Sequence, residues 1–337
     1  MSDVLPLRHA SVGDVVLESG ATARAVEVAY VLRDAAGALD RPTAHRPLVL
    51  AIPALTGDAP GAAQWAAEAL ATQGRTDAQV LALANLGSCT GTRTAPALDA
   101  HEAVTPRDMA AVALRLLDAL GAARPHVVAG GSLGGMVALE VTVSLGAPVH
   151  AVVLAAPAAQ TPWAHGLGHL HREALRLGGP RDGLALARAI GMLSYRSATE
   201  FNGRFTVDGE RTAVTYLRHH GERLLARFDA AAYARLVDAM DAHDAGRGRG
   251  GVAAALAPHA ARITGVGIPG DVLYPADDVR AWTEASGAHY ASITSVHGHD
   301  AFLLEPEQVG RILARALVAA ETERRTGVAP GRRERDA

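Results

Sequence analysis

The sequence predicts an α/β fold in which helices cover both faces of a mostly parallel sheet and a helical insertion interrupts the alternation. Continuous apolar runs alternate with segments of helical character; the runs span residues 47–52, 80–84, 127–129 and 151–156. Strands that are apolar throughout are typical of a parallel sheet buried on both faces. Residues 161–257 contain amphipathic helices and no convincing strand. We therefore expect a core at 1–160 and 258–325, a lid-like insertion at 161–257 and a flexible tail at 326–337.

The N-terminal part of the chain favours two antiparallel edge strands. Residues 15–18 (Val-Val-Leu-Glu) predict a short strand and residues 26–32 alternate between two faces, with the turn-prone pair Ser19-Gly20 between the two segments. The buried strand at 47–52 follows. It ends in a loop at 53–58, at the edge of a parallel sheet where ligands bind.

Helices and strands then follow in the order that a parallel sheet requires. Thr105 and Pro106 open a helix as its N-cap and first residue, and this helix extends to Leu120, with Gly121 as its C-cap. Before this helix we expect a helix at 65–71 and a polar loop at 85–94. After the insertion we expect a strand at 262–268, a helix at 276–286, a strand at 289–294 and a helix at 306–323.

The composition excludes several classes of function. The chain has 337 residues, a net charge of −3 and no long basic block, so we expect no nucleic-acid partner. It contains no lysine, which excludes Schiff-base chemistry. No apolar run approaches the ~20 residues of a membrane-spanning helix, and the N-terminus lacks a signal-peptide pattern. With a single cysteine, Cys89, these features favour a cytoplasmic protein without disulfides.

A glycine-flanked serine stands between a predicted strand and a predicted helix. Gly130-Gly131-Ser132-Leu133-Gly134 fits the pattern G-x-S-x-G, in which a strained turn exposes the serine hydroxyl as a nucleophile. The N–H of Leu133 then lies at the helix start, where it can stabilise an oxyanion. Such junctions also bind phosphates or simply pack tightly. The phosphate interpretation fits less well, because the glycines of this stretch do not form G-x-G-x-x-G and no Gly-Lys-Ser/Thr follows them.

A nucleophilic serine needs a base and an acid, which follow it in the chain order Ser, Asp/Glu, His. Asp271 follows the strand at 262–268, and His299 follows the next strand. His297 is an alternative base, but the apolar residues after His299 favour His299. Asp277 and Asp278 are alternative acids, but they suit the first turn of the following helix.

Other reactive residue types receive structural interpretations. His165, His169 and His171 lie close together, but no acid or cysteine stands at ligand spacing, so we expect no metal site. Cys89 is expected to be a small buried residue rather than a reactive thiol.

With these residues identified, the chain resembles the homoserine O-acetyltransferase family of the α/β-hydrolase superfamily over roughly residues 27–310. The resemblance is carried by Ala54-Leu55-Thr56-Gly57, Leu86-Gly87-Ser88-Cys89-Thr90-Gly91, Thr105-Pro106-Arg107-Asp108-Met109, Gly130-Gly131-Ser132-Leu133-Gly134-Gly135-Met136, Tyr195-Arg196-Ser197, Arg227-Phe228-Asp229, Ala239-Met240-Asp241-Ala242-His243-Asp244 and Gly298-His299-Asp300-Ala301-Phe302-Leu303.

The resemblance implies a ping-pong transfer of an acetyl group from acetyl-CoA, a substrate rather than a bound cofactor, to the hydroxyl of homoserine or a related amino acid. Ser132 would be the nucleophile, His299 the base and Asp271 the residue that orients it. The N–H groups of Leu55 and Leu133 would form the oxyanion hole.

The same resemblance implies acceptor contacts and an assembly. Arg172 is similar to the arginine that binds the acceptor carboxylate, and Asp300 to the residue that binds the acceptor ammonium. The family also implies a homodimer through the helices of the insertion. The pathway, methionine biosynthesis or another, stays open at this point.

The sequence departs from the family near the acceptor site. Pro53 replaces a histidine, the segment 94–104 is short, and residues 176–181 replace a longer stretch that carries a Trp and a Tyr. An esterase or thioesterase with water as acceptor is therefore the alternative function, since it needs the same catalytic residues. A non-catalytic binding protein is a third hypothesis, which the presence of all three catalytic positions disfavours.

Overall fold

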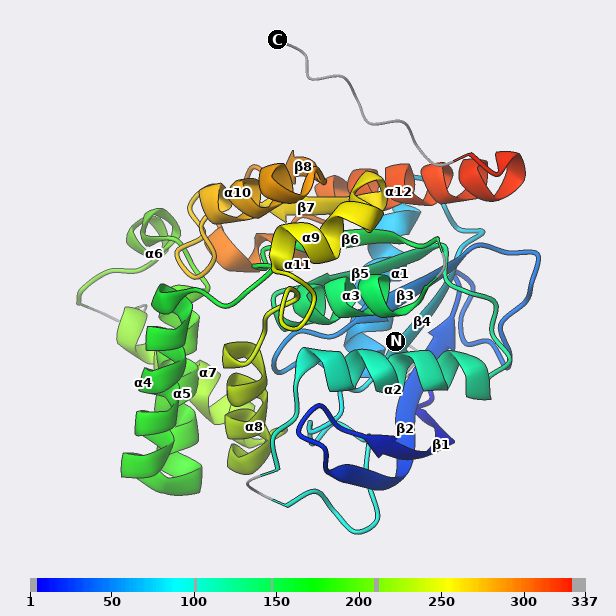
Figure 1. The fold of residues 1–337 in the computed structure, drawn as a ribbon. Coiled ribbons are helices and arrows are strands. Elements are labelled where there is room, and N and C mark those ends of the chain that lie inside the picture. Colours follow the sequence, from blue (N-terminus) through cyan, green and yellow to red (C-terminus); the bar gives the residue numbers. More distant parts are fainter. Residues whose placement is uncertain (1–4, 100–101, 147, 209–211, 329–337) are drawn as a thin grey trace.

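The computed structural model describes residues 5–99, 102–146, 148–208 and 212–328. Within these residues, eight strands form one sheet in the order β1-β2-β4-β3-β5-β6-β7-β8 (Figure 1). The strands are β1 (Arg8–Val16), β2 (Thr22–Arg33), β3 (Leu48–Ile52), β4 (Gln79–Leu83), β5 (Val127–Gly131), β6 (His150–Leu154), β7 (Ile263–Gly267) and β8 (His289–Ser292).

Strand pairing confirms the predicted mixture of a parallel sheet and antiparallel strands at one edge. β1 pairs with β2, and β2 with β4, in antiparallel fashion, whereas every pair from β4 to β8 is parallel. β1 begins at Arg8, well before the predicted residue 15, because its side chains are mostly exposed or half-buried and give no apolar run. An edge strand needs little apolar surface, so its length is hard to predict from hydrophobicity.

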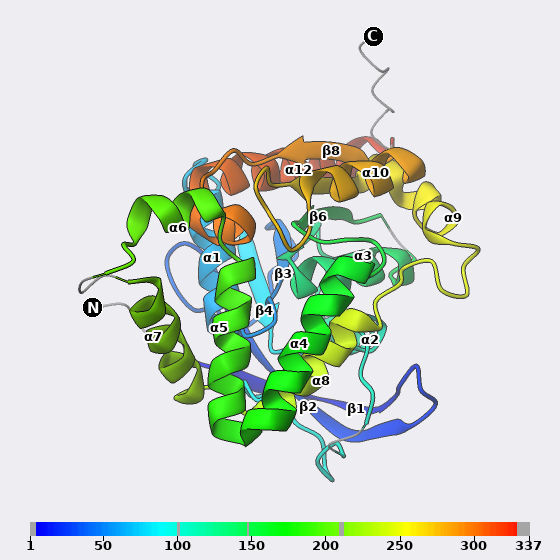
Figure 2. The ribbon, with the colours of Figure 1, turned by 90° about the vertical axis from the view of Figure 1, so that its left-hand side faces the viewer.

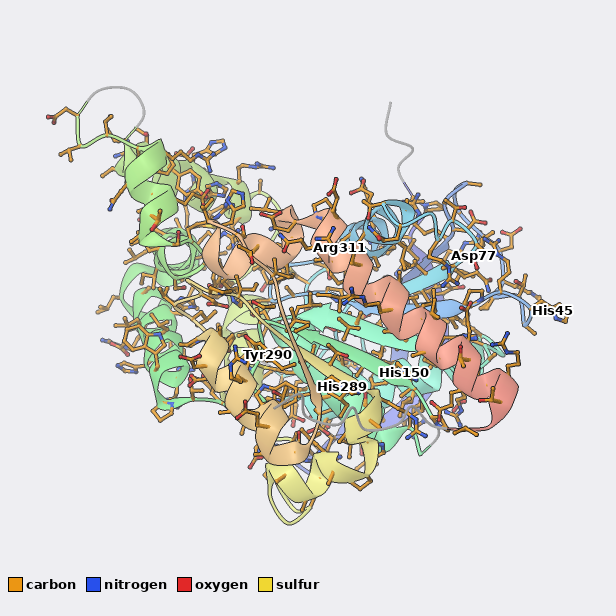
Figure 3. The ribbon with its side chains drawn as sticks, turned by 90° about the horizontal axis from the view of Figure 1, so that it is seen from above. His45, Asp77, His150, His289, Tyr290 and Arg311 are labelled. Atoms are coloured by element: carbon orange, nitrogen blue, oxygen red, sulfur yellow. The ribbon has the colours of Figure 1, made fainter. Side chains whose placement is uncertain are left out.

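Two hydrophobic layers explain the continuously apolar strands. In β3, Leu50 and Ile52 pack into the layer of α2 (Pro106–Ala119), α3 (Leu133–Ser144) and α10 (Ala276–Ser286). Val49 and Ala51 point into the layer of α1 (Ala59–Ala71) and α12 (Pro306–Thr326). Figure 3 views the molecule from above, with α12 lying across the sheet and His150 close to it. Alternate residues therefore face opposite helical layers, and both must be apolar.

The predicted helix start at Thr105 is confirmed in atomic detail. The Thr105 hydroxyl accepts from the Asp108 N–H and the Asp108 side chain accepts from the Thr105 N–H, which together make a capping box. The helix ends at Ala119, and Gly121 follows with a φ of 59°, a left-handed conformation typical of glycine after a helix.

The residues between β6 and β7 form a group of helices beside the sheet (Figures 1 and 2). They are α4 (Pro162–Gly178), α5 (Leu184–Ser194), α6 (Ala198–Arg204), α7 (Ala213–Leu225) and α8 (Ala230–Asp241). α9 (Val252–Leu256) falls inside the predicted insertion but packs against α10 of the core. The division at residues 160 and 257 stays a prediction, and residues 329–337 of the expected tail lie outside the described part.

Buried charges fix the point where the chain returns from these helices. Glu140 on α3, with 2% of its side chain exposed, accepts from Arg107 at 3.2 Å and from Arg249 at 2.8 Å. Arg247 binds Glu18 at 2.7 Å. Two guanidinium groups on one buried carboxylate compensate for its lost hydration. The ion pair between Arg249 and Glu140 therefore holds the loop 246–251 against α3.

No helix among the described residues has the length and apolar character needed to cross a bilayer.

Candidate active site

Ser132 occupies the strained turn that the sequence predicted, between β5 and α3. Its φ of 56° and ψ of −126° are unusual for a residue with a side chain. A Cβ atom added at Gly130 would overlap the backbone of Gly134, and one added at Gly134 would overlap the carbonyl oxygen of Ile52. The turn therefore closes only because both flanking positions lack side chains.

His299 and Asp271 form a buried pair. His299 lies in the 3₁₀ turn Gly298–Asp300 that follows β8, and its Nδ1 is 2.7 Å from Oδ2 of Asp271. The other carboxylate oxygen of Asp271 accepts from the backbone N–H groups of Leu273 and Tyr274, at 2.8 and 3.0 Å. The acid is thus held by its own loop, and an ionised Asp271 selects the tautomer in which Nδ1 carries the proton and Nε2 is free to accept one.

The surroundings of His299 act on its basicity in opposite directions. Burial lowers the pKa of His299, but the charge of Asp271 and the hydrogen bond to it outweigh burial, so that the pKa is raised above its ordinary value. A buried imidazole with a raised pKa is a better proton acceptor, as general-base catalysis requires.

The turn that carries His299 is packed directly against the strand that leads to Ser132. Phe302, in α11 (Ala301–Leu304), contacts the imidazole edge-on, with ring centroids 5.6 Å apart. The same ring lies so close to Gly131 that a Cβ atom there would overlap it. The indole N–H of Trp65 donates to the carbonyl of Phe302 at 2.8 Å. These contacts fix the position of His299 relative to β5.

Ser132 and His299 line one pocket of about 320 Å³. It lies over the carboxyl ends of β3 and β5, and Leu55, Arg188, Tyr195, Arg227 and Asp300 also line it. No hydrogen bond joins Ser132 to His299 within the described residues; such bonds are often long in an enzyme without substrate. Asp271 lies behind His299, outside the lining.

The predicted oxyanion donors lie beside this pocket. Leu55 lines it, and Leu133 is the first residue of α3, directly after Ser132. In the part of the chain that the structure describes, neither backbone N–H has a protein hydrogen-bond acceptor. Unpaired N–H groups at a helix start are available to a developing negative charge.

Arg172 is not brought to the pocket, although the sequence placed it in the acceptor site. It lies on α4, where its guanidinium binds Asp238 at 3.2 Å and also Asp241, both on α8. The guanidinium groups that do line the pocket belong to Arg188 on α5 and to Arg227 after α7. Sequence reasoning gave neither a role in the pocket: Arg227 was named only within the motif Arg227-Phe228-Asp229, and nothing in the helical pattern shows which face of α5 meets the pocket.

Asp300 lies in the pocket lining, as expected for a residue that contacts substrate. Its Oδ2 is 3.0 Å from Nε of Arg196. Burial raises the pKa of Asp300, and Arg196 and His299 oppose this shift. One side of the carboxylate is therefore already paired within the protein.

The competing residues have other partners. His297 lies 3.3 Å from Glu200, away from Asp271. Asp277 and Asp278 occupy the first turn of α10, as predicted.

The described residues contain no group of three metal-ligating side chains. Cys89 is exposed, which corrects the expectation that it is buried: it lies in a surface loop, not on a strand.

Comparison with known proteins agrees with the architecture and the motifs. The model of the α/β hydrolase fold family matches residues 47–225. A homoserine O-acetyltransferase of Thermus thermophilus is 46% identical over 252 residues, which cover 69% of this chain and 66% of that protein, slightly less than two thirds of its length. One of Clavibacter michiganensis subsp. michiganensis is 38% identical and covers 91% of each chain.

A solved structure extends the similarity to the fold. The homoserine O-acetyltransferase of Staphylococcus aureus superposes with a TM-score of 0.78 and 29% identity, and the match covers 93% of this chain and 95% of that one. With the sequence similarity above, this shows that the chain belongs to the homoserine O-acetyltransferase family, which has the α/β-hydrolase fold.

Proposed function

We propose that the protein is an acyl-CoA-dependent O-acyltransferase that moves an acetyl group to the hydroxyl of homoserine or a related amino acid. The observation that carries this proposal is the buried His299–Asp271 pair at a pocket that also exposes Ser132 in its strained turn. Membership of the family supports the choice of acetyl group and acceptor.

In the first half-reaction, Oγ of Ser132 attacks the thioester carbonyl while Nε2 of His299 takes the hydroxyl proton. The N–H groups of Leu55 and Leu133 stabilise the oxyanion that forms. When the C–S bond breaks, the imidazolium returns the proton to the thiolate. The acetyl group then remains as an ester on Ser132 and free CoA leaves.

In the second half-reaction, the acceptor hydroxyl attacks the ester on Ser132. His299 takes the proton of that hydroxyl and returns it to Oγ of Ser132 as the ester bond breaks, which regenerates the enzyme. Asp271 holds the imidazole in one orientation and stabilises its cation in both half-reactions.

Opposite charges in the pocket suit an amino-acid acceptor. The guanidinium of Arg188 would bind the carboxylate, a role we move from Arg172 because Arg172 is paired with aspartates elsewhere. Asp300 would bind the ammonium through the carboxylate oxygen that Arg196 leaves free.

The partition of products tests the proposal against the hydrolase alternative. The enzyme is incubated with acetyl-CoA, with and without homoserine, and CoA, acetate and O-acetylhomoserine are measured. We expect rapid CoA release only when homoserine is present. Equal release of CoA and acetate without an acceptor would make the protein a thioesterase. Succinyl-CoA and serine, tested in parallel, define the acyl and acceptor preferences.

We also propose that the insertion helices pair two subunits. Trp163, Leu170 and Leu177 recur at heptad spacing on α4 and are 60%, 49% and 73% exposed. Leu186 and Leu193 on α5 are each 52% exposed. Apolar side chains in such a stripe favour a helical partner. Sedimentation of a Leu177→Glu variant should show monomers where the unmodified protein is dimeric.

The use of acyl-CoA and an amino-acid acceptor is consistent with a place in methionine biosynthesis in the cytoplasm, and we propose this setting for the protein.

A further inference from the structure

A second cavity adjoins the reaction pocket and is lined mainly by basic side chains. Its volume is about 150 Å³, and it is bounded by Arg188, His220, Arg223, Leu224 and Arg227. Arg188 and Arg227 line both cavities. The basic cavity therefore begins at the wall of the pocket that exposes Ser132.

The packing of two helices creates this arrangement. α5 and α7 meet at Gly221, where an added Cβ atom would lie only 3.1 Å from Ala185. This close approach places Arg188, three residues after Ala185, next to the α7 residues that precede and follow Gly221. Arg227 lies beyond the end of α7, and its guanidinium donates to the carbonyl of Thr56 in the loop after β3.

The arginines of the cavity have acidic groups near them but form no close ion pair: the charge of Asp300 acts on Arg188 and that of Asp58 on Arg227. Among the described residues, no ion pair involves Arg188, Arg223 or Arg227. Burial, followed by the charges of Arg188 and other neighbours including Arg223, lowers the pKa of His220 to about 4. Burial and the charge of Arg188 likewise lower the pKa of Arg227, and Asp58 offsets part of this. Guanidinium groups that repel one another around a cavity are stabilised by a bound anion.

The number of charges favours a multiply charged ligand. One guanidinium, that of Arg188, is sufficient for the carboxylate of an amino acid, whereas this cavity offers two more, from Arg223 and Arg227, and the imidazole of His220. A phosphate monoester carries up to two charges and three acceptor oxygens, and guanidinium groups bind it in a bidentate manner. Acetyl-CoA, the proposed donor, carries phosphate groups at the end of its pantetheine arm, outside the acyl pocket.

We propose that Arg223, Arg227 and His220 form a binding site for a phosphate group of the acyl-CoA donor, while Arg188, on the wall shared with the reaction pocket, serves the acceptor carboxylate. This inference rests on the proposed function, since it assigns the donor's phosphates to a place next to the acylation site. Arg223 is its most informative residue, because it lines only the basic cavity and its side chain is exposed.

Kinetics with truncated donors test the site. Acetyl-CoA, acetyl-3′-dephospho-CoA and acetyl-pantetheine, which lacks every phosphate, are compared for the unmodified enzyme, for Arg223→Gln and for Arg218→Gln. Arg218 lies on the same helix, is exposed and lines neither cavity, so it is the matched control. Arg223→Gln should raise the KM for acetyl-CoA about tenfold with kcat unchanged. With acetyl-pantetheine, Arg223→Gln should equal the unmodified enzyme.

Acetyl-3′-dephospho-CoA shows which phosphate the site binds. If Arg223→Gln does not raise the KM for this donor, the site holds the 3′-phosphate. If the variant raises this KM as it does that for acetyl-CoA, the site holds the diphosphate. His220→Gln provides a second variant, with a rise in KM of about threefold. Calorimetric titration of free CoA compares the Ser132→Ala variant with the double variant Ser132→Ala, Arg223→Gln. It measures how much Arg223 contributes to the affinity for CoA when no turnover occurs.

Three results would overturn the inference. They are an unchanged KM for acetyl-CoA in Arg223→Gln, an equal rise for acetyl-CoA and acetyl-pantetheine, or a rise in the KM of the acceptor alone, which would assign the cavity to the acceptor carboxylate. Failure of the proposed function looks different: the unmodified enzyme would then release no CoA from acetyl-CoA while still cleaving simple acetyl esters.

Discussion

The two walls of the reaction pocket hold their polar groups by different means. On the sheet side, Ser132, His299 and Asp271 are each at most 5% exposed, and backbone geometry or backbone N–H groups fix them. On the insertion side, Arg188 on α5 and Arg227 in the turn after α7 reach the pocket through long side chains. The difference suggests that the sheet side determines the chemistry and the insertion side determines which molecules are used.

The largest expected effect lies on the sheet side. Replacing Ser132 by Ala removes the atom that carries the acyl group, so kcat/KM should fall roughly 10⁴-fold or more. Circular dichroism and thermal unfolding should be unchanged, and no acetyl adduct should appear in the intact mass after incubation with acetyl-CoA. An adduct in this variant would place the acyl group on another residue.

Asp271→Asn should lower kcat about 10³- to 10⁴-fold, because the amide no longer selects the productive tautomer of His299. The pH profile gives a second readout. Activity requires neutral His299, so it is lost as pH falls through the His299 pKa, which Asp271 helps to raise. Without that charge, burial dominates and the acidic limb of the profile should move to lower pH. A limb that stays in place would show that Asp271 does not govern the base.

The glycines of the two regions should also differ. Gly134→Ala introduces a methyl group against the carbonyl of Ile52, so the free energy of unfolding should fall by about 2–3 kcal/mol. Gly166 on α4 is the matched control, because an added Cβ has no neighbour within 4 Å. Gly166→Ala should be neutral or stabilising by up to about 1 kcal/mol. Urea unfolding measures both, and equal losses would contradict the constraint assigned to the Ser132 turn.

The smallest expected effects separate two arginines of the insertion. Arg188→Gln should raise the KM for the acceptor about tenfold, because it removes a charged partner in the pocket. Arg172→Gln should change it by less than about twofold, since that side chain is occupied by Asp238 and Asp241. Initial rates at varied acceptor concentration decide between them. The reverse ranking would restore the assignment that the sequence suggested.

The comparison also explains how far the sequence could predict this molecule. The sheet, its antiparallel edge and the turn at Ser132 were predictable, because apolar runs and obligatory glycines record backbone constraints in local sequence. Arg172 and Arg188 are both arginines on amphipathic helices, and only the packing of those helices determines which one meets the pocket. The exposure of Cys89 and the length of β1 were missed for a related reason, since edges and surface loops carry weak apolar patterns.

The contact between Phe302 and Gly131 has a consequence for how the reacting groups are spaced. Ser132 and His299 are 167 positions apart in the chain. The ring of Phe302 lies between Gly131 and the imidazole of His299, so this contact determines the distance between the two catalytic side chains. A methyl group at position 131 would displace the ring of Phe302, and with it the imidazole of His299 that packs against that ring. We therefore expect a substitution at residue 131 to lower kcat more than it raises the KM of either substrate, although residue 131 has no reactive atom.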